Sequence, residues 1–187
     1  MKCHECGGDL EVTRKDYLYL ESGLPNVTVC GIEVRRCKQC SNEDIVIPRL
    51  KQLHRAIAKA LLEKSSRFVP AEIRFLRKHL GWSQEDFARV FGLRPETISR
   101  WETGSERMSA PADRLLRLVV AKGDRVASYS VAQLQHLDDD NSEDLGLALK
   151  SCGSSWEPEL KATTVLASLV KEDHPPYGVR PAKKRLE

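Results

Sequence analysis

The spacing of apolar residues changes along the chain and predicts different secondary structure in different segments. Two runs rich in β-branched and aromatic residues, Tyr17–Leu20 and Val27–Cys30, lie on either side of Gly23. Such runs separated by turn residues predict two short β-strands. From Pro48 the apolar residues recur every three or four positions, which predicts a helix to about residue 64.

After an interruption at Ser65–Arg67, the helical spacing returns and predicts four helical segments over residues 70–122. The second has Ser83 at its start, where a hydroxyl accepts from free backbone N–H groups, and it ends at Gly92. The other three helices are expected at about Ala71–His79, at about Arg94–Glu102 and from near Pro111.

Residues 123–187 have a less regular pattern. Short helical patterns at Gln133–Leu137 and Leu160–Val170 lie on either side of the acidic stretch Asp138–Asp144. An acidic segment of this kind can mimic DNA, pack against a basic domain or stay disordered, and the sequence leaves all three open. The final residues are expected to form an exposed tail.

Together these patterns predict an α+β protein with more helix than strand. The expected divisions are a small N-terminal β module at 1–47, a helix and linker at 48–69, a four- to five-helix domain at 70–122 and a partly helical C-terminal extension at 123–187.

Composition narrows the class of protein. Of 187 residues, 41% are hydrophobic and 30% charged, as is usual for a soluble globular protein. No apolar run approaches the roughly 20 residues that a membrane-spanning helix needs, and Met1-Lys2-Cys3 does not begin a signal segment. We therefore expect a cytoplasmic protein without membrane contact, in a compartment where cysteine pairs bind metal more often than they form disulfides.

The charge is unevenly distributed. Residues 66–125 carry 12 Lys and Arg against 8 Asp and Glu, a net charge of +4, whereas residues 126–187 carry 7 against 10, a net charge of −3. A polyanionic partner is therefore expected to bind the middle segment.

Four cysteines stand in two pairs of identical spacing. Cys3 and Cys6 enclose two residues, as do Cys37 and Cys40. Four thiolates at this spacing suit one tetrahedral Zn²⁺ ion, and a closed shell of four protein ligands makes the site structural rather than catalytic. The alternatives are free buried thiols or redox pairs, although neither pair precedes a helix in a βαβ pattern as a thioredoxin-like site would.

The other cysteines and histidines are expected to lie outside this site. Cys30, on a predicted strand, reads as a small buried hydrophobic residue, and Cys152 is isolated. His4 lies inside the first cysteine pair and is expected to point outward. His54 is expected on the solvated face of its helix.

Residues 83–104 carry the strongest motif in the chain. Ala88 is small where a second helix would cross closely, Gly92 permits a tight turn, and Ile98 and Trp101 would anchor the following helix. That helix would present polar side chains suited to a DNA major groove, which are Arg94, Glu96, Thr97, Ser99 and Arg100. The alternative is a four-helix bundle with a surface arginine.

This stretch resembles the lambda-repressor-like (Xre-type) DNA-binding domain, over about residues 70–122. The resemblance implies that Gln84 contacts DNA at the start of the second helix. It also implies a partly buried ion pair between Arg77 and Glu102, which would brace the first helix against the third.

The order of elements resembles the MqsA (YgiT-type) antitoxin family over residues 1–122. Three features carry the resemblance: the opening Met-Lys-Cys-x-x-Cys-Gly-Gly, the second cysteine pair about thirty residues later and Ser-Arg-Trp-Glu-Thr-Gly. It implies a zinc module that binds an mRNA-cleaving toxin and a homodimer that binds a palindromic operator in double-stranded DNA and represses its own promoter. Glu96 stands where the family has a base-reading Asn.

Two functions follow from the sequence. One is a repressor that is the antitoxin of a toxin–antitoxin pair; the other is a free-standing Xre-type regulator whose zinc module has no toxin partner. No Ser/His/Asp arrangement, phosphate-binding glycine loop or open metal site is recognisable in the sequence, and we therefore expect no enzymatic activity.

Overall fold

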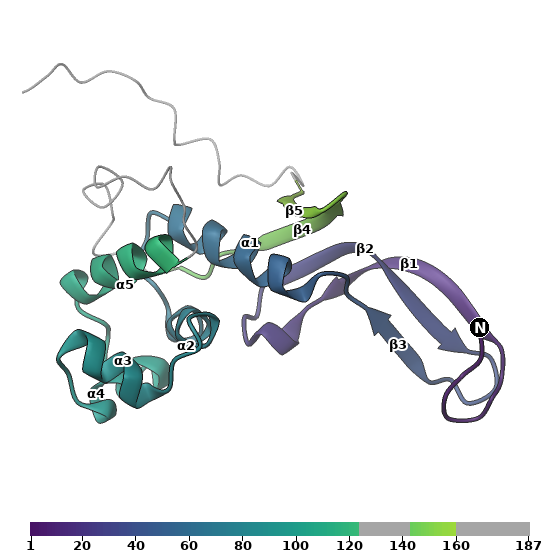
Figure 1. Cartoon of the computed structure of the whole chain (residues 1–187), viewed down its shortest axis with the longest axis horizontal. Helices are drawn as coiled ribbons and strands as arrows, with labels where there is room; N and C mark the ends of the chain where they lie inside the picture. The colour runs from purple at the N-terminus through teal and green to yellow at the C-terminus, as the bar shows by residue number, and fades with distance from the viewer. Residues whose placement is uncertain (124–142, 160–187) are drawn as a thin grey trace, which may run out of the picture.

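A computed structural model describes residues 1–123 and 143–159 of the chain (Figure 1). Within these residues an elongated arrangement of strands leads into a group of helices. The helices are α1 (Leu50–Glu63), α2 (Pro70–His79), α3 (Gln84–Phe91), α4 (Pro95–Thr103) and α5 (Ala110–Gly123). The strands are β1 (Leu10–Leu18), β2 (Val27–Cys37), β3 (Glu43–Val46), β4 (Leu147–Cys152) and β5 (Ser155–Pro158).

All five strands belong to one sheet built around β2. β1 pairs with β2 antiparallel along its length, whereas the opposite side of β2 has two partners. β4 runs parallel to the first half of β2, from Val27 to Cys30, and β3 runs antiparallel to the second half, from Glu33 to Arg36. β5 forms a hairpin with β4 at the edge of the sheet.

The hydrophobic core is continuous between the sheet and the helices. Leu53 and Ile57 of α1, Val29 of β2 and Leu149 of β4 are all fully buried in it. α1 contacts β4 and β5 on one side and α2 and α5 on the other (Figure 1). The helix from Pro48 to about residue 64 that the sequence predicts is therefore the element that joins the sheet to the other helices.

The first two strands are longer than the sequence predicts. β1 begins at Leu10 and β2 continues to Cys37, while Leu20–Ser22 forms a short 3-10 helix instead of strand. β1 is exposed on most of both faces, so its sequence lacks the apolar alternation by which a half-buried strand is recognised. Backbone pairing with β2, a long-range contact, makes this segment a strand.

The hairpin of β4 and β5 has no counterpart among the sequence predictions. It returns the chain to the N-terminal sheet and buries Leu149 and Trp156. Part of the C-terminal extension is thus a component of the sheet. The helices expected at Gln133–Leu137 and Leu160–Val170, most of the acidic stretch and the C-terminal tail lie outside the described residues.

Candidate DNA-binding surface and metal centre

The turn between α3 and α4 is formed by local features of the sequence. Ser83 Oγ accepts from the backbone N–H of Asp86, and the Asp86 carboxylate accepts from the backbone N–H of Ser83 at 3.1 Å, which makes a reciprocal cap. The Ser83 hydrogen bonds lower the pKa of Asp86. At the other end Gly92 adopts φ +66°, and Leu93 N–H donates to the Ala88 carbonyl at 2.8 Å.

Aromatic packing fixes α4 across α3. The rings of Phe87 and Phe91 meet edge to face with centroids 4.5 Å apart, and Trp101 packs against Phe87 from the other helix. Ile98 and Ala88 are buried between the two helices. α4 is therefore held in place by packing, with one face toward the core and the other toward solvent.

A buried carboxylate connects α2, α3 and α4. Arg77 donates to Glu102 through Nε and, at 3.0 Å, through Nη2, and its Nη1 donates to the Trp82 carbonyl at 2.8 Å. Gln84 Nε2 donates to the same carboxylate at 2.9 Å. Burial raises the pKa of Glu102, but the hydrogen bonds from Arg77 and Gln84 outweigh burial and hold it below the usual value.

This network restricts two of the side chains that the sequence singles out. Arg77 and Glu102 are paired, and most of the surface of both is buried. Gln84 is half-buried at the start of α3, and Glu102 fixes its amide in one orientation, with the NH₂ group turned toward the carboxylate. The carbonyl oxygen of Gln84 remains the atom with which this side chain could contact another molecule.

The outer side of α4 holds the other predicted site residues. Arg94, Glu96 and Arg100 are exposed, and Thr97 and Ser99 are half-buried. Arg100 pairs through Nε with Glu106 at 2.8 Å, and its Nη2 donates to Thr97 Oγ1 at 3.2 Å. Glu106, which follows α4, thus orients Arg100, a partner that sequence reasoning missed.

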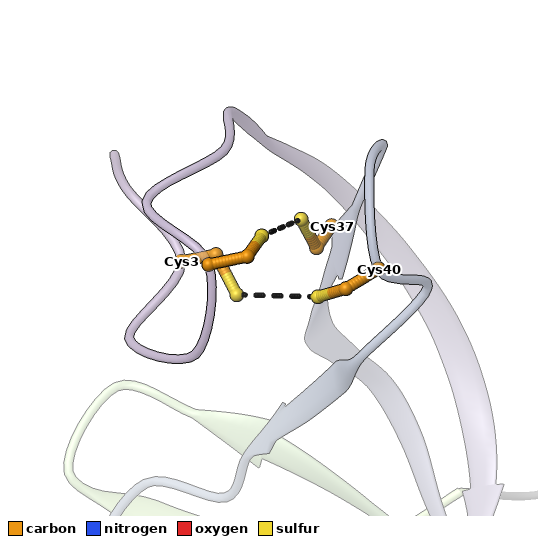
Figure 2. Close-up of side chains that lie close together, drawn as sticks. Cys3, Cys37 and Cys40 are labelled. Atoms are coloured by element: carbon orange, nitrogen blue, oxygen red, sulfur yellow. Dashed lines mark hydrogen bonds between the residues drawn. The ribbon is translucent and has the colours of Figure 1, made fainter.

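The four predicted metal ligands come together at the end of the sheet nearest the N-terminus. The loop after Met1 brings in Cys3 and Cys6. Cys37 ends β2 and Cys40 lies in the turn before β3, and Figure 2 shows both facing the loop that carries Cys3. The Sγ atoms of Cys3 and Cys40 are 3.7 Å apart and those of Cys6 and Cys37 are 3.4 Å apart. All four sulfur atoms lie within 4.8 Å of one another.

These distances suit a tetrahedral ion, because Zn–S bonds of about 2.3 Å place sulfur atoms roughly 3.8 Å apart. Backbone N–H groups of Cys40 and Gln39 lower the pKa of Cys37 to about 6, which favours a thiolate. The Asn42 N–H lowers the pKa of Cys40, but the thiols of Cys6 and Cys37 raise it to about 12. Four thiolates this close together would repel one another, which opposes ionisation of all four. A divalent cation would offset that repulsion.

Among the described residues, the other cysteines and the histidines singled out in the sequence are not part of this cluster. Cys30 is buried in β2, and Cys152 is partly buried at the end of β4. His4 is exposed, with Nε2 3.1 Å from Glu5 Oε1. His54 is not on a solvated face as expected: it is half-buried, and its Nε2 lies 3.0 Å from Tyr19 Oη. That expectation is wrong because the rings of Tyr19 and Phe75 pack against the imidazole.

Comparison with known proteins identifies the helical domain. Residues 73–121 match the family described as Helix-turn-helix, and they span α2 to α5 except for a few terminal residues. No curated protein matches the chain. Within the described residues, no helix has both the length and the apolar character needed to cross a membrane. The chain thus contains both a DNA-binding type of helix-turn-helix and a four-cysteine centre that is able to hold a metal ion.

Proposed function

We propose that this protein is a sequence-specific transcriptional repressor of the Xre type that reads the DNA major groove with α4. The observation that carries the proposal is the outer face of α4 within the matched domain. Arg94, Thr97 and Arg100 lie on or beside one side of a short helix whose opposite side is anchored by buried Ile98 and Trp101. The proposed activity is regulatory rather than enzymatic.

Each exposed group has a role that its chemistry supports. Arg100 suits bidentate donation to a guanine, and Arg94, at the start of α4, suits a phosphate or base edge. Thr97 and Ser99 are small hydroxyl groups that can approach bases closely. Glu96 repels phosphate but accepts well from a cytosine amino group, so we expect a C in the half-site. The Gln84 carbonyl can accept from a base at the start of α3.

We further propose that the protein acts as an antitoxin. The four-thiol centre precedes the DNA-binding domain in the order typical of the MqsA-like family, whose zinc module binds a toxin. In this role a homodimer would bind a palindromic operator and repress its own promoter, with one structural Zn²⁺ per chain. The alternative is a free-standing regulator in which the zinc module only supports the fold.

The DNA-binding proposal is tested by selecting duplexes from a random library and measuring affinity by fluorescence anisotropy. Arg100→Ala should cost about 1–3 kcal/mol on the selected sequence and relax the preference at one base pair. Lys59→Ala, an equal loss of charge on α1, should leave the preference unchanged. If both variants retain the wild-type preference, α4 is not the reading helix.

The antitoxin proposal is tested by affinity capture of the tagged chain from its native host. A small protein encoded next to this chain should be retained, and the Cys37→Ser variant should lose it while its α2–α5 domain stays folded. The captured protein should cleave mRNA until the wild-type chain is added. Capture of no neighbouring gene product would favour the free-standing regulator.

A further inference from the structure

The side of β2 that pairs with both β3 and β4 has a gap. Pairing with β4 stops at Cys30 and pairing with β3 starts at Glu33, so Gly31 and Ile32 have no strand beside them there. Figure 1 shows β3 and β4 against different halves of β2, with the start of α1 near the point where they separate. Gly31 adopts φ +62°, which marks the irregularity in β2.

A cavity of about 340 Å³ lies at this gap, and we call it the seam cavity. This volume falls within the range of roughly 300–1,000 Å³ typical of small-molecule sites. Four strands, β1 to β4, and the residues before α1 contribute to its walls. The side chains that bear on its chemistry are Arg14, Cys30, Glu33, Arg49, Lys150 and Ser151.

The seam cavity is electropositive. Three cations line it, and the one carboxylate, Glu33, already accepts from Arg35 Nε at 2.6 Å. Arg14 and Lys150 form no ion pair or hydrogen bond through their side chains within residues 1–123 and 143–159. Two exposed cations on different strands thus line one cavity, whose lining carboxylate is already paired with Arg35.

Arg49 adds a second, independent indication of an anion. Its backbone has φ +51°, a left-handed conformation uncommon for a residue with a side chain, and it holds the guanidinium against β4, where Nη2 donates to Ser151 Oγ. Its Nε atom is buried and has no acceptor among the described residues. A buried donor without an acceptor is costly, which is why such groups usually have a partner.

The start of α1 lies at the same place. Arg49 is its N-cap and offers no side-chain acceptor, and the first turn contains no acidic residue. The first N–H groups of α1 therefore lack the negative partner that helix N-termini favour. An anion in the seam cavity would supply an acceptor for Arg49 and place negative charge near this helix start.

We propose that the seam cavity binds a small oxoanion, the phosphate or carboxylate group of an organic molecule. The planar guanidinium of Arg49 suits two oxygen atoms of such a group, and Lys150 and Arg14 add positive charge from the two neighbouring strands. The cavity exceeds the size of the anionic group itself, so it has room for an attached organic part. Ser151 offers a hydroxyl to that part.

Such a ligand would connect the N-terminal sheet to the helices. It would bridge β2, β4 and the start of α1, while β2 continues to Cys37 and α1 continues to the helix-turn-helix domain. Binding would stabilise the junction of the sheet with α1. The seam cavity is thus a candidate effector site, separate from both α4 and the cysteine centre.

The test measures thermal unfolding of the full zinc-loaded chain with inorganic phosphate, glycerol 3-phosphate and succinate, each titrated at constant ionic strength. A saturable rise in the midpoint is expected with at least one of them, because a ligand of the folded state stabilises it. Saturation with the phosphates alone identifies a phosphate ligand, and saturation with succinate alone a carboxylate. Either result supports the proposal.

Lys150→Gln and Arg14→Gln should weaken the apparent affinity by about tenfold or more, because a charge-assisted contact is lost. Both side chains are exposed and form no ion pair within the described part of the chain, so these variants should fold. Lys122→Gln, which removes an exposed charge from α5, should leave the affinity unchanged. Absence of saturation with all three probes, or equal weakening by Lys122→Gln, would overturn the proposal.

Discussion

The His54 imidazole joins three parts of the chain that are distant in sequence. Its Nε2 lies 3.0 Å from Tyr19 Oη, and its ring meets the edge of Phe75 with centroids 5.8 Å apart. Burial, and then the charge of His79, lower the pKa of His54. The folded protein therefore favours the neutral imidazole.

This lowered pKa predicts a pH dependence of stability. The unfolded chain takes up a proton on His54 near pH 6.5, whereas the folded chain resists protonation until lower pH, so the free energy of unfolding should fall as pH drops below about 6.5. His54→Gln keeps an acceptor for Tyr19 but cannot titrate. Thermal melts of both proteins at several pH values should show that the melting temperature falls less in acid for the variant. Some fall should remain in both proteins, because the cysteine centre titrates in both. Parallel acid losses would contradict the assignment.

A second carboxylate, that of Glu106, forms an ion pair with Arg100. Glu106 holds it at 2.8 Å, and both side chains are about half exposed. A base contact through Arg100 Nε would require it to leave this partner, and Glu106 itself would repel phosphate. The ion pair therefore competes with the proposed contact.

Glu106→Gln should accordingly tighten binding to the selected duplex by about 1.4- to fivefold, the size expected when an exposed ion pair of about 0.2–1 kcal/mol no longer competes. Anisotropy titration would measure this change in affinity, with Glu157→Gln on β5 as the control for net charge. Weaker binding by Glu106→Gln would show instead that the ion pair positions Arg100 usefully.

At the scale of elements, α1 and α5 are joined by a fully buried arginine. Arg117 Nε donates to Asp113 at 2.7 Å, and its two terminal nitrogens donate to the carbonyls of Lys64 at 2.7 Å and Ser66 at 2.8 Å. Its Cζ lies 4.1 Å above the Phe68 ring. The segment after α1 is thus held by hydrogen bonds to α5 and does not serve as a free linker.

Arg117→Met should lower the free energy of unfolding by about 3–5 kcal/mol, because it leaves Asp113 buried without its cation and several carbonyls without a donor. Urea unfolding would measure the loss. Lys122→Met, on the exposed side of the same helix, should change stability by about 0.5 kcal/mol or less. Similar values for the two variants would mean that the buried network contributes little net stability.

At the scale of the molecule, the four-cysteine centre and α4 are far apart. The N-terminus and the adjoining ends of β1 and β2 lie at one end of the longest axis, and α3 and α4 lie at the other (Figure 1). Between them, the first half of β2 packs into the core with β4 and α1. Loss of a bound metal should therefore destabilise mainly the N-terminal end of the sheet.

Removal of the proposed Zn²⁺ by a chelator should increase amide hydrogen exchange in residues 1–16 and 33–46, while Val27–Cys30 and α2–α5 keep their protection. Cys37→Ser should reproduce this pattern, and Cys152→Ser should not. Hydrogen exchange read by mass spectrometry would locate the change. Loss of protection in α4 on chelation would show that the two ends are coupled.

Features set by near neighbours were predictable from the sequence. The cap at Ser83 and the turn at Gly92 depend on residues within a few positions, so α3 and α4 could be placed. The cysteine spacing likewise indicated one centre, since ligand type and spacing carry most of that information. The longer first strand was missed because it is exposed on both faces and its sequence shows no period.

The sequence by itself thus determined the helices, the turn between α3 and α4 and the set of four thiols, because these follow from local periodicity, backbone preference and ligand chemistry. Only the tertiary structure decided that β4 joins β2, that Arg117 lies buried beneath the end of α1 and that three separate cations line the seam cavity. These three features depend on contacts between residues that are distant in sequence, in some cases by more than a hundred positions. The hydrophobic pattern of a short strand cannot specify its partner, and a charged residue does not show in sequence whether it will be buried.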